Sequence, residues 1–341
     1  MTPRTAYISS IFGIIAAAIL AACTPVDKQA DNGQTASAPA ASAAEQKKIA
    51  ITAIADHPAL DTIRAGVLDG LKAEGFEEGK NLTVDFQSAQ GSTANAAQIA
   101  KKFAGANPDA IIAITTPSAQ AVAAATKNIP LIYTAVTDPV GAKLVPSLEP
   151  SHTNITGVSD ELPVGPQIDL MKKLVPNLKT IGYVYSPGEV NSTTVLERLK
   201  AKAAEQNIQV ITAPAQRSAD VLTAARSLGG KADVIFTSLD NNVVSSYESM
   251  YKASMELKIP LVASDADSVT RGAVAALGMD SFGTGQKAGK LAAAVLKGGK
   301  PGDMPSEKLD QLDLYLSKKH AAALGITLPE ELLKEAKEVK E

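Results

Sequence analysis

The chain has no tryptophan, a single cysteine and only three histidines among its 341 residues, and each scarcity excludes a class of site. One cysteine leaves no partner for a disulfide, a CxxC redox pair or a cysteine-rich zinc cluster. His57, His152 and His320 stand far apart in the sequence, and no glycine-rich phosphate loop or metal-spaced cluster appears. We therefore expect no cofactor, no metal site and no enzymatic activity. The missing tryptophan also argues against a sugar ligand, which proteins usually stack on a large ring.

An excess of charge of either sign is also missing. Acidic residues number 36 and basic residues 33, so no basic face of the kind that binds a phosphate backbone is expected. Nucleic acid is thereby excluded as a partner.

The N-terminus carries the pattern of an export signal. Arg4 precedes an apolar run at 11–20, which is too short for a membrane span of about 20 residues. Leu20-Ala21-Ala22-Cys23 then resembles the lipobox of bacterial lipoproteins; an ordinary signal peptide with an incidental cysteine, or an uncleaved anchor, is the alternative. The sequence predicts a lipoprotein signal peptide at 1–22, lipidation of Cys23 and an extracytoplasmic location, in the periplasm or on the cell surface. Residues 23–46 lack hydrophobic periodicity and are expected to form a flexible tether.

From Lys47 onward, short apolar runs alternate with segments of helical period, which predicts an α/β fold with parallel sheets covered on both faces. Residues 109–132 and 233–262 share an order of strand, helix and an Ile-Pro-Leu entry into the next strand. This favours two Rossmann-like lobes over one large sheet. We expect a three-segment hinge between a lobe of residues 47–157 plus 280–300 and a lobe of residues 158–279 plus 301–341.

A ligand is expected at the loops that follow the strands, since open parallel sheets bind ligands at the carboxyl ends of their strands. The six loops are 56–58, 115–120, 134–141, 186–192, 239–242 and 264–268. They contain no Lys or Arg, and the acids among their residues include Asp138, Glu189, Asp240, Asp265 and Asp267. A helix that begins near Thr116 suits a carboxylate, and the acids suit an ammonium group, so the loops together suit a zwitterion. The competing interpretation is that Asp240 and Asp265 merely cap the helices that follow them.

Several segments, in one order along nearly the whole chain, resemble the substrate-binding proteins of ABC transporters, of the tryptophan- and tyrosine-binding lipoprotein type. The segments are 56–61, 116–120, 136–142, 157–160, 185–192, 240–241 and 263–269. The resemblance implies a type I periplasmic-binding-protein fold, closure on a ligand, and delivery to an ABC permease with a separate ATPase.

Carried over residue by residue, the resemblance implies a ligand site in the cleft between the lobes. Thr116, Pro117, Ser118 and Ala119 would receive the ligand carboxylate. Asp265, with Asp240 or Asn241, would hold the amino group, while Glu189 and Asn191 would line the second lobe. His57 and Asp138 complete the expected ligand contacts. Ile54 and Ala55 stand where a bulky or aromatic residue would be expected, which leaves ring stacking unsupported.

The sequence thus predicts a monomeric, lipid-anchored binding protein of an ABC importer whose ligand is an amino acid, aromatic ones among the candidates. Two alternatives stay open on the same fold. One is a ligand-sensing lipoprotein that signals to another partner. The other is an exported enzyme, for which His57 beside Ser118 is the one nucleophile and base pair that can be constructed.

Overall fold

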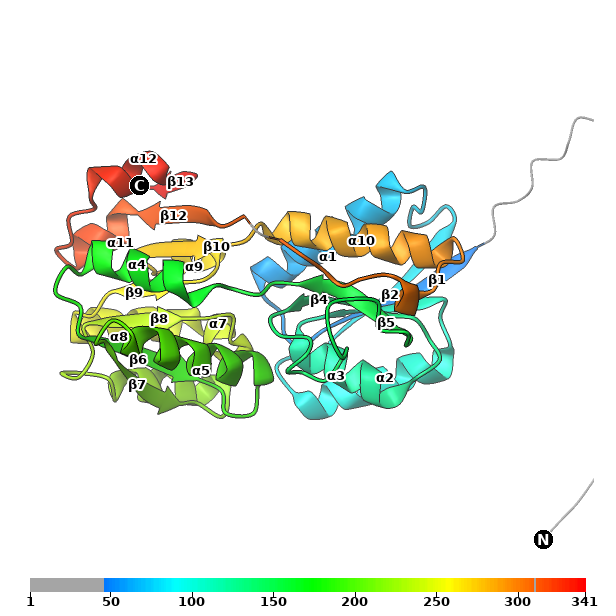
Figure 1. The fold of residues 1–341 in the computed structure, drawn as a ribbon, viewed down its shortest axis with the longest axis horizontal. Coiled ribbons are helices and arrows are strands. Elements are labelled where there is room, and N and C mark those ends of the chain that lie inside the picture. The colour runs from blue at the N-terminus through cyan, green and yellow to red at the C-terminus, as the bar shows by residue number, and fades with distance from the viewer. Residues whose placement is uncertain (1–45, 310) are drawn as a thin grey trace, which may run out of the picture. The chain divides into compact units, whose positions relative to one another are not determined.

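The computed structural model describes residues 46–309 and 311–341, which build two α/β lobes around two separate sheets (Figure 1). The predicted signal peptide, the lipidation site Cys23 and the tether up to residue 45 lie outside the described residues. Within these residues, none of the helices combines the length and the apolarity that a bilayer crossing requires.

The first lobe is built on a six-stranded sheet with the order β11-β5-β4-β3-β1-β2, in which every neighbouring pair is parallel. Its strands are β1 (Lys47–Ala53), β2 (Leu82–Ser88), β3 (Ala110–Ile114), β4 (Leu131–Val136), β5 (Ile155–Ser159) and β11 (Glu307–Lys308). Its helices are α1 (Pro58–Ala73), α2 (Thr93–Ala106), α3 (Thr116–Ala125), α10 (Ser281–Leu296) and the short 3-10 helix η2 (Pro301–Asp303). Helices α1 and α10 cover one face and α2 and α3 the other, which is why all five residues of the apolar strand β3 are buried.

Helix α10 returns to the first lobe late in the chain and packs on α1 with the two backbones in near contact. A Cβ atom at Gly285 would lie 2.1 Å from the carbonyl oxygen of Ile63, and one at Gly289 2.2 Å from that of Val67. Only glycine permits this approach. The close packing fixes the start of α10 at the edge of the cleft.

The second lobe is built on a seven-stranded sheet with the order β13-β12-β10-β9-β8-β6-β7. Its strands are β6 (Thr180–Tyr185), β7 (Gln209–Pro214), β8 (Val234–Thr237), β9 (Leu261–Ala263), β10 (Ala275–Gly278), β12 (Asp313–Ser317) and β13 (Glu338–Lys340). Its helices are α4 (Val164–Leu174), α5 (Val190–Ala204), η1 (Ser218–Asp220), α6 (Val221–Arg226), α7 (Asn241–Ser245), α8 (Tyr247–Leu257), α9 (Ala266–Arg271), α11 (Lys318–Ala323) and α12 (Glu330–Glu335). One pair departs from the expected parallel arrangement, because β12 runs antiparallel to β10. The chain enters β12 from the first lobe, and so it crosses the sheet in the opposite direction.

Three segments connect the lobes, joining β5 to α4, β10 to α10 and β11 to β12. The sheets differ from the expected boundaries at two places. Strand β5 stays in the first sheet as far as Ser159, where Ser159 pairs with Val136, and β11 pairs with β5. Residues 158–159 and 301–308 therefore lie with the first lobe. The backbone pairing continues past the apolar run from which the boundary was inferred.

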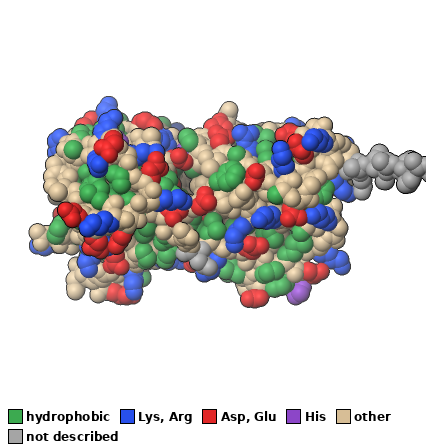
Figure 2. Space-filling view, turned by 90° about the horizontal axis from the view of Figure 1, so that it is seen from above, with side chains coloured by type: hydrophobic (Ala, Val, Ile, Leu, Met, Phe, Trp, Pro, Cys, Tyr) green, Lys and Arg blue, Asp and Glu red, His purple; other side chains and the backbone are tan. Residues whose placement is uncertain are grey.

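The surface carries charges of both signs. On the face in Figure 2, Lys and Arg side chains are interspersed with Asp and Glu, and the described part of this face has no continuous basic area. This distribution agrees with the near balance of charges in the sequence.

Candidate functional site

A cavity with an empty volume of about 750 Å³, part of it open to solvent, is lined by residues of both lobes. Most of its lining follows the carboxyl ends of strands β1, β3, β4, β5, β8 and β9, or comes from the helices that begin there. The lining residues are His57, Ala59, Leu60, Ile63, Thr115, Thr116, Ala135, Thr137, Asp160, Leu162, Asn191, Leu239, Asp240, Asn241, Val244, Ser245, Ser264, Asp265, Met279, Ser281 and Thr284. Among the described residues that line it there is no Lys, Arg, Phe, Tyr or Trp.

The first-lobe wall contains strained backbone. Thr115 has a φ of 81° and Ala135 a φ of 53°, and both residues line the cavity at the ends of the adjacent strands β3 and β4. At Ala135 the register between β4 and β5 shifts. A positive φ is costly for a β-branched residue such as Thr115, of the order of 1–3 kcal/mol, and such strain concentrates at binding sites.

Five cavity-lining residues have a buried polar side-chain atom without a hydrogen-bond partner. They are Thr115 and Thr116 (Oγ1), Asp160 and Asn191 (Oδ1), and Ser264 (Oγ). Buried polar atoms are nearly always paired in folded proteins, since an unpaired one loses the hydrogen bonds that water gave it. A polar ligand is the natural partner for these groups.

Among the acids that line the cavity, Asp160 is the one with a carboxylate oxygen that has no hydrogen-bond partner. It follows β5 at the first crossing between the lobes, is 8% exposed, and its Oδ1 has no partner. Burial raises its pKa to about 6, against a smaller effect of hydrogen bonds from Thr137 and from its own backbone. The residue stood in the family-like segment 157–160, but it was not among the predicted ligand contacts. Its position directly after a strand at a crossing was the signal that could have identified it.

Asp240 and Asp265 line the cavity, but their carboxylates already serve as helix caps. Asp240 accepts hydrogen bonds from the backbone N–H groups of Ser186 (2.6 Å) and Val243 (3.0 Å) and from the hydroxyls of Ser186 and Ser192. Asp265 accepts from the N–H (2.9 Å) and the hydroxyl (2.6 Å) of Ser268. Burial raises the pKa of both acids. Both residues therefore cap the helices that follow them, and Asp240 accepts more hydrogen bonds than Asp265 does.

Glu189 lies behind the cavity wall and positions two residues of it. Its Oε2 accepts from Nδ2 of Asn191 (3.0 Å) and from the N–H (3.1 Å) and Nδ2 (2.6 Å) of Asn241. Burial, with Asp240 nearby, raises the pKa of Glu189. Direct ligand contact was expected of Glu189, but it is not among the residues that line the cavity.

The predicted carboxylate site at the start of α3 is partly on the cavity surface. Thr116 lines the cavity, whereas Pro117, Ser118 and Ala119 are buried in the helix and do not. Asp138 does not line the cavity either. Its carboxylate accepts a hydrogen bond from the N–H of Gly141 (2.7 Å) and forms an ion pair with Arg198 of α5 (3.2 Å).

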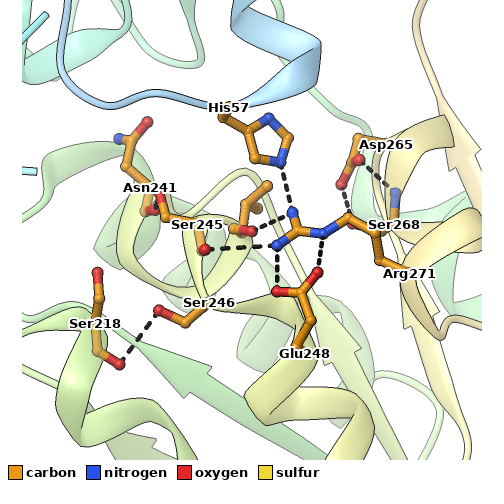
Figure 3. Close-up of polar contacts among 10 residues, drawn as sticks. His57, Ser218, Asn241, Ser245, Ser246, Glu248, Asp265, Ser268 and Arg271 are labelled. Carbon is orange, nitrogen blue, oxygen red and sulfur yellow. Dashed lines mark hydrogen bonds and ion pairs between the residues drawn. The ribbon is translucent and has the colours of Figure 1, made fainter. Parts of the chain in front are cut away.

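His57, which lines the cavity, is in contact with Arg271, which does not line it (Figure 3). His57 is the N-cap of α1, and its Nε2 lies 2.9 Å from Nη1 of Arg271, at the end of α9. Sequence reasoning missed Arg271, because it searched only the loops for cations. Burial, and secondly Arg271, lower the pKa of His57 to about 4.

The chain matches the family model described as ABC transporter substrate binding protein over residues 48–340. It belongs to this family. The chain is 39% identical to the tyrosine-binding protein of Clostridioides difficile (strain R20291) over 319 residues, which cover 93% of this chain and 91% of that protein. Members of this family are extracytoplasmic proteins that bind solutes for transport, and they are not enzymes.

Two solved structures of family relatives indicate how the lobes are arranged. The chain superposes with a TM-score of 0.84 on an ABC domain of Streptococcus pneumoniae in complex with L-Trp, at 36% identity over 86% of this chain and 100% of that one. It superposes with a TM-score of 0.66 on a ligand-free, open substrate-binding protein with adhesive properties from Clostridium difficile, at 39% identity over 86% of this chain and 99% of that one. Since the two identities are close, the higher score means that the whole structure is more similar to the L-Trp complex than to the ligand-free, open protein.

Proposed function

We propose that this substrate-binding protein captures an amino acid in the cavity between its lobes. The observation that carries the proposal is the set of unpartnered polar atoms on the lining. The hydroxyls of Thr115, Thr116 and Ser264 can donate hydrogen bonds, whereas the free oxygens of Asp160 and Asn191 accept them. An α-amino acid brings the complementary carboxylate and ammonium group.

The carboxylate lies at the start of α3. The hydroxyls of Thr115 and Thr116 are there, and the first N–H groups of a helix have no carbonyl partner within it. A helix N-terminus also favours a negative charge.

The ammonium group pairs with Asp160. This replaces the expected assignment to Asp265 with Asp240 or Asn241, because the carboxylates of Asp240 and Asp265 already accept hydrogen bonds from their own lobe. An ammonium group at Asp160 supplies the charge that this buried carboxylate lacks. Asn191 and Ser264 contact the ligand from the second lobe.

The ligand side chain is large and apolar, with aromatic ones preferred. Leu60, Ile63, Leu162, Val244 and Met279 give the cavity an apolar wall. The names of the relatives, one tyrosine-binding and one solved with L-Trp, support an aromatic ligand. The ring then packs on aliphatic side chains, because the described lining includes no Phe, Tyr or Trp on which it could stack.

The protein is a monomer held on the membrane through a lipid on Cys23, and it delivers its ligand to an ABC permease with an ATPase. The lipobox-like segment 20–23 and the tether composition support the anchor. Membership of the substrate-binding family supports the transporter partners.

Thermal denaturation with chosen ligands tests the binding proposal. L-tryptophan and L-tyrosine should stabilise the protein, by about 2.7 kcal/mol at a hundred times the dissociation constant. Tryptamine lacks the carboxylate and indole-3-propionate lacks the ammonium group, so neither should stabilise comparably. Equal stabilisation by either analogue would rule out recognition of the zwitterion.

A further inference from the structure

A contact between the two lobes involves a titratable ring that also lines the cavity. His57 belongs to the first lobe and Arg271 to the second, and their nearest atoms, Nε2 and Nη1, are 2.9 Å apart. Any opening of the cleft there separates them.

Each partner is held in place by its own lobe. Arg271 donates from Nε and Nη2 to the two carboxylate oxygens of Glu248 (2.8 and 2.7 Å), as Figure 3 shows. Its Nη1 also donates to the carbonyl of Val244 (2.7 Å). Nδ1 of His57 lies 3.1 Å from the backbone N of Ala59, in the N-cap of α1, and accepts its hydrogen bond when the ring proton is on Nε2. The guanidinium and the imidazole are therefore both in position before the lobes close.

The surroundings of His57 disfavour a second proton on the ring, because both ring nitrogens face hydrogen-bond donors. One ring nitrogen faces the N–H of Ala59 and the other faces a guanidinium N–H. A neutral imidazole has one acceptor nitrogen, so it accepts either from Arg271 through Nε2, with its proton on Nδ1, or from Ala59 through Nδ1. The contact between the lobes uses the first tautomer. An imidazolium carries N–H on both nitrogens and accepts neither bond. An imidazolium would also face the like charge of Arg271 in a place where His57 is only 5% exposed.

We propose that His57 and Arg271 form a latch that holds the lobes closed only while His57 is neutral, so that mild acidification opens the cavity. Arg271 acts through His57 and not by touching the ligand, and it is in this sense a positioning residue. The proposal rests on the closed arrangement of the lobes and not on the identity of the ligand.

The charges around His57 agree with this direction. Arg271 and Asp267 face it from α9, Glu248 from α8, and Asp61 from its own helix. The three acids favour the imidazolium, but burial and Arg271 outweigh them and lower the pKa from 6.5 to about 4. In the open state the imidazole of His57 regains its ordinary pKa of 6.5. At a pH between about 4 and 6.5, closure of the lobes therefore releases a proton from His57. The equilibrium constant for closure should then be about tenfold smaller at pH 5.5 than at pH 7.5.

A second contact between the lobes provides a matched control without a histidine. Arg198 of α5 pairs with Asp138, after β4, at 3.2 Å and with Glu161, after β5, at 2.8 Å. Arg198→Gln should favour opening to the same extent at pH 7.5 and 5.5. His57→Gln keeps a neutral acceptor for Arg271 and does not titrate in this range.

The experiment measures the distance between the lobes without ligand, by double electron–electron resonance between spin labels on Lys101→Cys in α2 and Lys200→Cys in α5. Cys23→Ser removes the native cysteine, and both label positions are exposed. The otherwise unchanged protein should shift from the short to the long distance between pH 7.5 and 5.5, while the His57→Gln protein should not shift. An unchanged distribution in the former, or an equal shift in both, would overturn the latch. Melting temperatures at both pH values establish that each variant is folded.

Discussion

The acidic side chains on the two walls of the cavity differ in how many hydrogen bonds their carboxylates accept, although Asn191 and Ser264 on the second-lobe wall also have an unpartnered side-chain oxygen. On the second-lobe wall, Asp240 and Asp265 have their carboxylates bonded by neighbouring N–H groups and hydroxyls. On the first-lobe wall, Asp160 and the threonines at the start of α3 have buried oxygens without partners, and Thr115 is strained. An acid in a cleft therefore does not by itself indicate a ligand contact; a buried carboxylate with an oxygen that the fold leaves without a partner is the stronger indication. The first wall should carry binding at a cost in stability, and the second should carry stability.

The largest effect is expected for Asp160→Asn. It removes the charge that holds the ammonium group, so affinity for L-tryptophan should fall at least about a hundredfold. Isothermal titration calorimetry measures the loss, and Asp61→Asn, an exposed change on α1, is the control. If Asp160→Asn bound as tightly as the unchanged protein, the ammonium contact would lie elsewhere.

Asp160 should also make the ligand-free protein less stable as pH rises. Its folded-state pKa is raised to about 6, so the folded state holds this proton more tightly than the unfolded chain does. The resulting stability is fully present below the unfolded pKa of about 3.9 and is lost as pH rises through 6, about 3 kcal/mol in all. Urea denaturation between pH 4 and 7 measures this term as the difference between the unchanged protein and Asp160→Asn. Parallel curves for the two proteins would contradict it.

On the opposite wall, Asp240→Ala should act mainly on folding. It leaves the N–H groups of Ser186 and Val243 without their acceptor, which should cost about 3 kcal/mol of unfolding free energy. Urea denaturation measures that cost, and affinity for L-tryptophan, determined where the variant is fully folded, should change less than threefold. A large loss of affinity with unchanged stability would reverse the comparison between the walls.

The smallest effect is expected for Thr115→Gly. Glycine adopts a φ of 81° without strain, so the variant should gain about 1 kcal/mol of stability while it loses a hydroxyl that contacts the ligand. Thr116→Ala is the matched control, since it also removes a hydroxyl of the site but relieves no positive φ. Denaturation and calorimetry on both variants separate the two effects, and a less stable Thr115→Gly protein would contradict the strain argument.

The sequence predicted the parts of this fold that depend on local patterns. The apolar run at 110–114 and the helical periods around it predicted buried parallel strands between helices, as observed in β3. The antiparallel direction of β12 was missed, because it depends on where the chain crosses between the lobes. The family and the cleft between the lobes followed from motifs spread along the chain.

The sequence could not predict which side chains of the site already have hydrogen-bond partners within the fold. The cap that Asp240 forms on the N–H of Val243 is local, but the further hydrogen bonds to its carboxylate come from Ser186 and Ser192, which are 54 and 48 residues away. Arg271 is 214 residues from His57, and only the folded lobes bring the two together. Asp160 was visible in the sequence as an acid after a strand, but its missing partner was not.

The most direct test of the account is a crystal structure of the complex with L-tryptophan, or with L-tyrosine if that stabilises the protein more. The account predicts the α-amino nitrogen within hydrogen-bond distance of the Asp160 carboxylate and the ligand carboxylate at Thr115 and Thr116. An amino group bound by Asp240 or Asp265, with Asp160 still unpaired, would contradict it.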